Sequence, residues 1–476
     1  MWKLINDVLN KFRICFSRQA AFDWFVIIIV GIMIRSDALG VSSVIRDLAI
    51  DHKHYASMMQ FFRASSWKLD TLRTQWISIV RSIAPLWQEN GMTILIGDGV
   101  KQSKEARKMP GVKRLHQESE NSSKAEYIFG HMFGGVGVLA GNLGKLFCIP
   151  LSLRLHDGVK TIHQWRNTGE EMGSHVVEMI KDGFKTAKIM GDSLMLLDRY
   201  FLSVPALDKL NQLNFANGHL LHILTKAKMS CVAYTKPIKK NGKGRPRKKG
   251  DSVKLRELFE TNKDKFNESK IELYGKEETV KYLCLNLLWG QKLYQELRFV
   301  LVKYNERNAI LVTTKLNLEP EKIIRLYSYR FKIECTFREL KQLLGGFSYQ
   351  FWCKSMPKFK KYAKKHQPQP VEKITCEKVQ NKILATLDAI EAYVICTSVS
   401  MGLLQIISLK FSRDINMRGF RFLRTKSKET VSEATVACYL RKNIFSFIEK
   451  SNKFSISQII KKKQADPLFY EDRLAS

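Results

Sequence analysis

The sequence predicts an α/β core with a β-rich insertion, joined to an all-helical N-terminal region and a mainly helical C-terminal region. Apolar residues recur at helical spacing over residues 1–90, which contain no proline before Pro85. Short apolar runs alternate with helical patterns over residues 91–225, which is typical of an α/β sheet. A long apolar helix is expected over residues 383–409. The length of 476 residues suggests about three structural units.

The composition indicates a polyanionic partner. The chain has 79 Lys and Arg residues against 45 Asp and Glu residues, a net charge of +34. Nucleic acid and an anionic membrane are the candidates. The most apolar stretch, residues 24–34, is much shorter than the roughly 20 residues of a bilayer-spanning helix, so we expect a buried helix and no membrane. Nine scattered cysteines without a Cys-x-x-Cys pair indicate a reducing, cytoplasmic setting.

The surplus charge is concentrated in two regions. Residues 219–304 carry a net charge of +11 and residues 351–476 carry +13, so together they hold 24 of the 34 excess charges. The segment KPIKKNGKGRPRKK, residues 236–249, has eight basic residues, and its glycines and prolines exclude a regular core element. A solvated loop has the same composition. We predict that this segment contacts DNA phosphates through Lys239, Lys240, Arg245 and Arg247.

Two acidic residues follow short apolar runs in the predicted core. Residues 93–98 read TILIGD and residues 187–192 read AKIMGD, and both patterns predict a buried strand that ends in an acid. Open α/β sheets place their chemistry at the carboxyl ends of strands. Asp98 and Asp192 are therefore the candidate acids. Asp198 falls in a segment expected to be helical and is interpreted as a surface charge.

A helix predicted over residues 321–344 ends at Gly345-Gly346. At about 100° per residue, Tyr327, Arg330, Glu334 and Lys341 share one stripe of its surface, about 60° wide. An adjacent apolar stripe can hold the helix against a core. A carboxylate flanked by basic groups and a phenol suits a metal ligand beside phosphate-contacting residues. A solvated face with ordinary salt bridges also explains this stripe.

The spacing Tyr327-x2-Arg330-x3-Glu334-x6-Lys341 resembles the signature of the DDE insertion-sequence transposases. The surrounding YSYRFKIECTFRELKQ is similar to that family, and Asp98 in ILIGDG and Asp192 in IMGDS resemble its two aspartates. The resemblance covers roughly residues 1–350. It implies an RNase H-like core, a mixed five-stranded sheet with helices. A β-rich insertion between the second acid and the glutamate has the placement found in the hairpin-forming branch.

The resemblance also implies a function. The chain would be a metal-dependent transposase that cuts at the ends of an insertion sequence and joins them to target DNA. Asp98, Asp192 and Glu334 would hold two Mg²⁺ ions, with Mn²⁺ as a substitute. Arg330 and Lys341 would contact phosphates of the transposon end, and Tyr327 would position the backbone or a distorted base.

Further expectations concern the insertion and the partners. Trp289 lies where related enzymes stack an extruded base, although a packed strand residue fits equally well. The partners would be double-stranded DNA, as terminal inverted repeats and target, and a second copy of the chain in a synaptic homodimer. The protein would be associated with the nucleoid.

These expectations divide the chain into four parts. We predict a helical DNA-binding domain over residues 1–90, a catalytic domain over 91–350, a β-rich insertion over 226–314 and a basic, mainly helical region over 351–476. Two other functions remain open. One is a catalytically inactive DNA-binding regulator derived from a transposase. The other is an RNase H-like nuclease, such as a junction resolvase.

Overall fold

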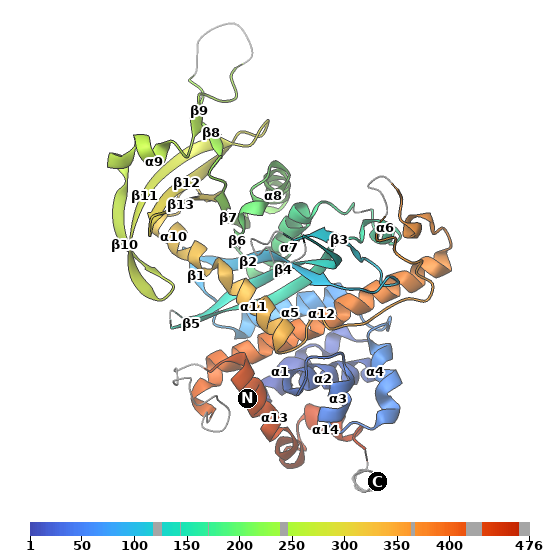
Figure 1. Ribbon diagram of the computed structural model, residues 1–476. Helices are drawn as coiled ribbons and strands as arrows, with labels where there is room; N and C mark the ends of the chain where they lie inside the picture. The colour runs from blue at the N-terminus through green and yellow to red at the C-terminus, as the bar shows by residue number, and fades with distance from the viewer. Residues whose placement is uncertain are drawn as a thin grey trace.

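A computed structural model describes residues 1–117, 126–142, 144–169, 171–238, 246–362, 367–415 and 431–465. It is a mixed α/β protein in which one large sheet lies beside a layer of helices (Figure 1). The N-terminal helices and the C-terminal helices, far apart in the sequence, lie side by side in that layer. The β-rich insertion projects from the other end of the molecule.

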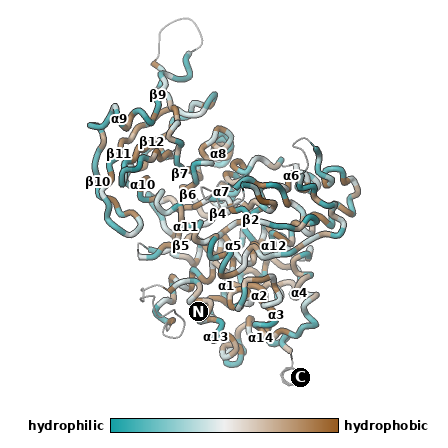
Figure 2. Tube along the Cα trace, in the orientation of Figure 1, coloured by the Kyte–Doolittle hydropathy of each residue, from teal (hydrophilic) through white to brown (hydrophobic). Residues whose placement is uncertain are grey.

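The expected helices of residues 1–90 are present. Their bounds are α1 Trp2–Lys11, α2 Gln19–Ile34, α3 Ser42–Asp47, α4 Tyr55–Phe61 and α5 Leu69–Ile83. Helix α2 contains the most apolar stretch of the sequence, and its residues from Trp24 to Ile34 are all buried. It packs against the helices α12 Glu377–Phe411, α13 Glu433–Lys450 and α14 Ser455–Lys461. The apolar run therefore forms the centre of a helical core, as the sequence predicted (Figure 2).

One described helix, from Glu377 through the turn that ends at Asp414, is long and apolar enough to cross a membrane. Its most apolar window is 94% buried inside the protein. A helix that is apolar on every side is typical of the centre of a core, and neighbours surround α12: α2, α5 and α13 pack against it, together with one strand of the sheet. Its composition is thus explained by burial.

The centre of the sheet is mixed. The strands before the insertion are β1 Gln88–Glu89, β2 Met92–Ser103, β3 Lys113–His116, β4 Tyr127–Asn142, β5 Lys145–Asp157, β6 Ser193–Leu197 and β7 Leu221–Ala227. Five of them lie in the order β5-β4-β2-β6-β7. β4 runs antiparallel to β2 and β5, whereas β2, β6 and β7 are parallel. The helices α6 Lys160–Gln164, α7 His175–Met190 and α8 Val204–Asn217 connect these strands.

The prediction of a strand over residues 187–192 is wrong. These residues complete helix α7, which ends at Met190, and Gly191 follows with φ +91°. A positive φ suits glycine at a helix C-terminus. The strand is β6, so Asp192 comes immediately before it and Asp198 comes immediately after it. Asp198 is followed by a single 3₁₀ turn, Arg199–Phe201.

Residues 226–314 are rich in β-structure. The elements are β8 Val232–Tyr234, β9 Ser252–Lys254, α9 Leu258–Thr261, β10 Asn267–Leu273, β11 Lys276–Trp289, β12 Gln295–Tyr304 and β13 Arg307–Thr313. The turn between β12 and β13 has Asn305 and Glu306 at positive φ, as a two-residue hairpin favours. β13 pairs with β7, so the strands of the insertion continue the central sheet.

The helix predicted over residues 321–344 is formed by two helices. They are α10 Pro320–Ser328 and α11 Lys332–Gln342, joined by a 3₁₀ turn at Tyr329–Phe331. α11 packs on β5 and β2 through its apolar stripe, which includes Phe337. Gly135 on β4 permits this approach, because a methyl group there would lie 2.7 Å from the Phe337 ring. The helix that carries Glu334 thereby lies against the strand that carries Asp98.

Candidate active site

Asp98 and Asp198 are neighbours on parallel strands. β2 and β6 pair with Gly97 opposite Leu197, so the next residues, Asp98 and Asp198, are level with each other. β2 continues past Asp98 to Ser103 because β4 pairs with it as far as Gly130. Both aspartates line one cavity of about 870 Å³. Asp198, interpreted from the sequence as a surface charge, therefore belongs to the candidate site.

Asp192, the expected second acid, lies at the opposite end of β6. Its carbonyl accepts a hydrogen bond from the amide of Thr93, at the start of β2. Asp192 and Asp198 lie six positions apart, on either side of the five residues of β6, which is a distance of about 20 Å at 3.3 Å per residue. The Asp192 side chain is exposed. The expected grouping of Asp192 with Asp98 is thus contradicted, because the strand that was predicted to precede Asp192 actually follows it.

Arg330 connects the helix to the strand. Its Nη1 lies 3.3 Å from Oδ2 of Asp98, and its Nη2 donates to Oε1 of Glu334, one turn along the helix. The guanidinium therefore bridges two of the three carboxylates. The predicted stripe of Tyr327, Arg330 and Glu334 does face the core strand that bears Asp98, despite the 3₁₀ turn between Tyr327 and Glu334.

The pKa of Asp98 reflects its burial and the charged groups near it. Burial raises the pKa of Asp98 to about 6, the charge of Arg330 and the amide of Gly99 oppose the rise, and the carboxylates of Asp198 and Glu334 add to it. The Gly99 amide donates to Oδ1 of Asp98 at 2.7 Å. Burial also raises the pKa of the Tyr327 phenol, with Arg330 opposing. A bound cation would favour the ionised form of Asp98.

The donor set suits a hard divalent cation. Mg²⁺ takes oxygen ligands and binds through one or two carboxylates together with water and substrate phosphates. Asp98, Asp198 and Glu334 are the residues that would hold it. Among the residues that the structure describes, no group of three acidic, histidine or cysteine side chains is already close enough to enclose an ion. The Arg330 guanidinium supplies the positive charge between Asp98 and Glu334.

Lys341 lines the same cavity as Asp98 and Asp198. Its Nζ lies 3.4 Å from the carbonyl oxygen of Lys101 on β2. The cavity is also lined by Lys101 and Arg114, and by Lys113, which pairs with Asp157. Such a rim suits a phosphate backbone.

The other predicted contact residues lie elsewhere. Trp289 ends β11, is half-buried, and hydrogen-bonds with Cys231. None of its described contacts reaches the carboxylates. Arg247 is exposed at the base of the basic segment, whereas Lys239, Lys240 and Arg245 lie outside the described residues.

Sequence reasoning missed Asp198, although a signal was present. The helical pattern of α7 runs to Met190, and Gly191 is a typical residue after a helix C-terminus. The following residues, Ser193–Leu197, form an apolar run that ends in an acid, as TILIGD does. Assigning Gly191 as the helix end would have identified Asp198.

Comparison with protein families gives a match over part of the chain. Residues 165–350 match the family model described as the transposase DDE domain. The matched region contains Asp198 and the whole stripe from Tyr327 to Lys341, and Asp98 precedes it. No curated protein and no solved structure matches the chain. Residues 165–350 are therefore similar to a transposase DDE domain, and the resemblance of the chain to the DDE insertion-sequence transposases is confirmed.

Proposed function

We propose that the protein is a DNA transposase that cuts the ends of an insertion sequence and joins them to target DNA with Asp98, Asp198 and Glu334 as its acidic triad. The observation that carries the proposal is that Arg330 pairs with both Asp98 and Glu334, while Asp198 lies level with Asp98 on the neighbouring parallel strand. The strand order β5-β4-β2-β6-β7, with only the first two connections antiparallel, supports an RNase H-like core.

The roles of the residues follow from their positions. Asp98, Asp198 and Glu334 would hold two divalent ions, Mg²⁺ or Mn²⁺. Such ions, when bound, activate the attacking hydroxyl and stabilise the leaving oxygen of the phosphodiester. Arg330 neutralises Asp98 and Glu334 in the free protein. Because bound cations would replace that charge, the guanidinium becomes available to a DNA phosphate at the same place.

The remaining charge serves to hold the DNA. Lys341 lies on the rim of the cavity and is suited to contact the phosphates of a transposon end. The basic segment with Lys239, Lys240, Arg245 and Arg247, and the basic C-terminal region, would bind the backbone of the inverted repeats or of the target. Trp289 is retained as a candidate for stacking an extruded base. A homodimer that pairs two ends, in the cytoplasm and on the nucleoid, completes the proposal.

The domain boundaries proposed for this activity are those predicted from the sequence: a helical DNA-binding domain over residues 1–90, a catalytic domain over 91–350 with its insertion over 226–314, and a basic region over 351–476. The packing of the first and last of these regions in one helical layer supports a single frame that positions the catalytic domain (Figure 1).

A cleavage assay tests the proposal. The wild-type chain is incubated with Mg²⁺ and duplex DNA from the flanks of its own gene, and strand scission is measured. Asp98→Asn and Glu334→Gln should abolish scission and leave DNA binding largely intact, because each removes one charge and keeps the side-chain shape. Scission at the wild-type rate by either variant would contradict the triad. DNA binding without scission by the wild type would instead indicate a regulator.

A further inference from the structure

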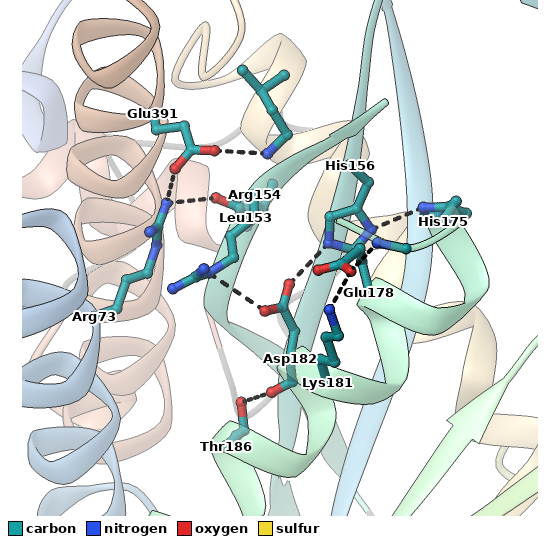
Figure 3. A network of polar contacts seen from close by, with 12 residues as sticks. Arg73, Leu153, Arg154, His156, His175, Glu178, Lys181, Asp182, Thr186 and Glu391 are labelled. Atoms are coloured by element: carbon teal, nitrogen blue, oxygen red, sulfur yellow. Dashed lines mark hydrogen bonds and ion pairs between the residues drawn. The ribbon is translucent and has the colours of Figure 1, made fainter. Parts of the chain in front are cut away.

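A buried chain of polar side chains leads from helix α7 into the candidate active site. Oδ2 of Asp182 lies 2.9 Å from Nε2 of His156, and Nδ1 of His156 lies 2.9 Å from Nδ1 of His175 (Figure 3). Asp182 and His175 are both on α7, whereas His156 is on β5 and almost completely buried. His175 lines the cavity that contains Asp98 and Asp198.

The end of this chain away from the cavity is firmly held. Nε of Arg154 lies 3.4 Å from Oδ1 of Asp182, and Arg154 also pairs with Asp70 on α5. Burial alone would raise the pKa of Asp182, but Arg154 and the hydrogen bond with His156 bring it to about 2. Asp182 is therefore a carboxylate at neutral pH, and a carboxylate only accepts hydrogen bonds.

The ionised Asp182 decides which ring nitrogens carry protons. Because Asp182 accepts, Nε2 of His156 must donate, and a neutral imidazole then has Nδ1 as an acceptor. Nδ1 of His175 must donate to that acceptor. A neutral His175 is left with a lone pair on Nε2. Burial lowers the pKa of His175 to about 3, which keeps this ring neutral.

The free nitrogen of His175 lies beside the catalytic strand. A methyl group at position 99 would be 2.9 Å from Nε2 of His175, so this atom lies against the backbone next to Asp98. Among the described residues, the hydrogen bonds of His175 involve Nδ1 alone. On the far side of the relay, Gly134 makes room for His156, because a methyl group there would lie 1.8 Å from its Cε1.

We propose that Asp182 and His156 fix the tautomer of His175, so that its Nε2 accepts a hydrogen bond from the attacking hydroxyl of water or of a DNA 3′ end. This inference rests on the proposed function and adds one substrate-contacting residue, His175, and two positioning residues to it. No proton is transferred in this role: the hydroxyl is oriented by donating to Nε2, and the pair of electrons that attacks phosphorus points away from His175.

The variant Asp182→Asn tests the role of the His175 tautomer most directly. The Asn carbonyl can still accept from Arg154, while its amide group donates to Nε2 of His156. That reversal places the proton of His156 on Nδ1 and that of His175 on Nε2, so the nitrogen beside Gly99 becomes a donor. The substitution keeps the positions of the three side chains but exchanges donor and acceptor at each hydrogen bond between them. Such an exchange is known to disable a histidine that must accept a hydrogen bond.

Histidine-selective ¹⁵N NMR of the wild type, without DNA, reads the tautomers directly. His175 should be protonated on Nδ1, and Asp182→Asn should move that proton to Nε2. A wild-type His175 protonated on Nε2 would overturn the proposal. This measurement does not depend on whether the protein is a transposase.

Single-turnover cleavage at saturating DNA is the second measurement. Asp182→Asn and His175→Asn should each lower the rate about tenfold or more, the value of one hydrogen bond, with DNA affinity unchanged. His175→Gln, whose amide oxygen can reach the position of Nε2, should recover part of the rate. Thr186→Val, on the same helix, is the control for packing and should cleave normally, because the Thr186 hydroxyl donates to the backbone carbonyl of Asp182 and not to its carboxylate.

The outcomes separate the two proposals. Wild-type rates in folded Asp182→Asn and His175→Asn would refute the role of His175 and leave the acidic triad standing. A wild-type protein that never cleaves would contradict the proposed function, and the NMR result would then decide the tautomer by itself.

Discussion

Asp98 is a residue of the candidate site whose pKa its surroundings raise strongly. Its raised pKa means that the folded protein binds the Asp98 proton more tightly than the unfolded chain does. Stability is therefore lost as the pH rises from about 4 to about 6, and the loss is complete at pH 7. A shift from 3.8 to about 6 corresponds to about 3 kcal/mol as an upper bound.

Asp98→Asn should consequently stabilise the metal-free protein at pH 7 by about 1–3 kcal/mol. The gain should disappear near pH 4, where Asp98 itself is protonated. Arg330 keeps Glu334 as a partner in this variant. Urea unfolding at the two pH values measures the difference, with Asp192→Asn, at an exposed position, as the control. A variant less stable than the wild type at pH 7 would show that Asp98 is not strained in the folded state.

At the scale of the elements, two close approaches determine where the functional side chains lie. Gly135 admits Phe337 of α11, and Gly134 admits the ring of His156. Gly134→Ala should lower the free energy of unfolding by about 1–3 kcal/mol, because the added methyl group overlaps a buried ring. It should also disturb the contact between His156 and His175.

Chemical denaturation and the ¹⁵N spectrum of His156 measure these two effects. Gly144→Ala is the matched control, since among the described residues the atom nearest its added methyl group is Oδ1 of Asn142 at 3.3 Å. Equal losses of stability in the two variants would contradict the packing argument.

The sequence predicted most elements but not every boundary. Continuous apolar runs identified α2 and α12 as buried helices. The runs AKIM and LMLL, in contrast, are both short and apolar, and such runs do not distinguish helix from strand by periodicity. The length of β2 was also hidden, since β4, a distant segment, extends it.

The residues of the candidate site were also only partly predictable from the sequence. Tyr327, Arg330 and Glu334 follow from local helical geometry, which the sequence contains. The partner of Asp98 follows from the register of two parallel strands, and an error of six residues in one strand exchanges Asp198 for Asp192. The relay of Asp182, His156 and His175 depends on β5 packing against α7, which no local pattern reveals.

At the scale of the whole molecule, the surplus positive charge and the acidic residues of the candidate site lie in different segments of the chain. Residues 219–304 and 351–476 carry 24 of the 34 excess positive charges, whereas the acidic residues of the candidate site belong to nearly balanced segments. Such a division is suited to a protein that grips a polyanion over a wide surface and cuts it at one point.

Neutralising Lys239, Lys240, Arg245 and Arg247 to Gln should therefore weaken binding to every DNA sequence and flatten the dependence of affinity on salt. Each lost phosphate contact lowers the slope of log affinity against log salt by about 0.9. Binding isotherms at several salt concentrations measure this slope for a specific and a random duplex. A loss confined to the specific duplex, with the slope unchanged, would show that these side chains read sequence instead.

The central claim is that Asp198, and not Asp192, completes the acidic triad. Cleavage of element-end DNA in Mg²⁺ by two variants, Asp192→Asn and Asp198→Asn, tests it most directly. The register of β2 and β6 predicts that Asp198→Asn abolishes cleavage while Asp192→Asn, about 20 Å away, cleaves at the wild-type rate. Cleavage by Asp198→Asn together with its loss in Asp192→Asn would contradict the account.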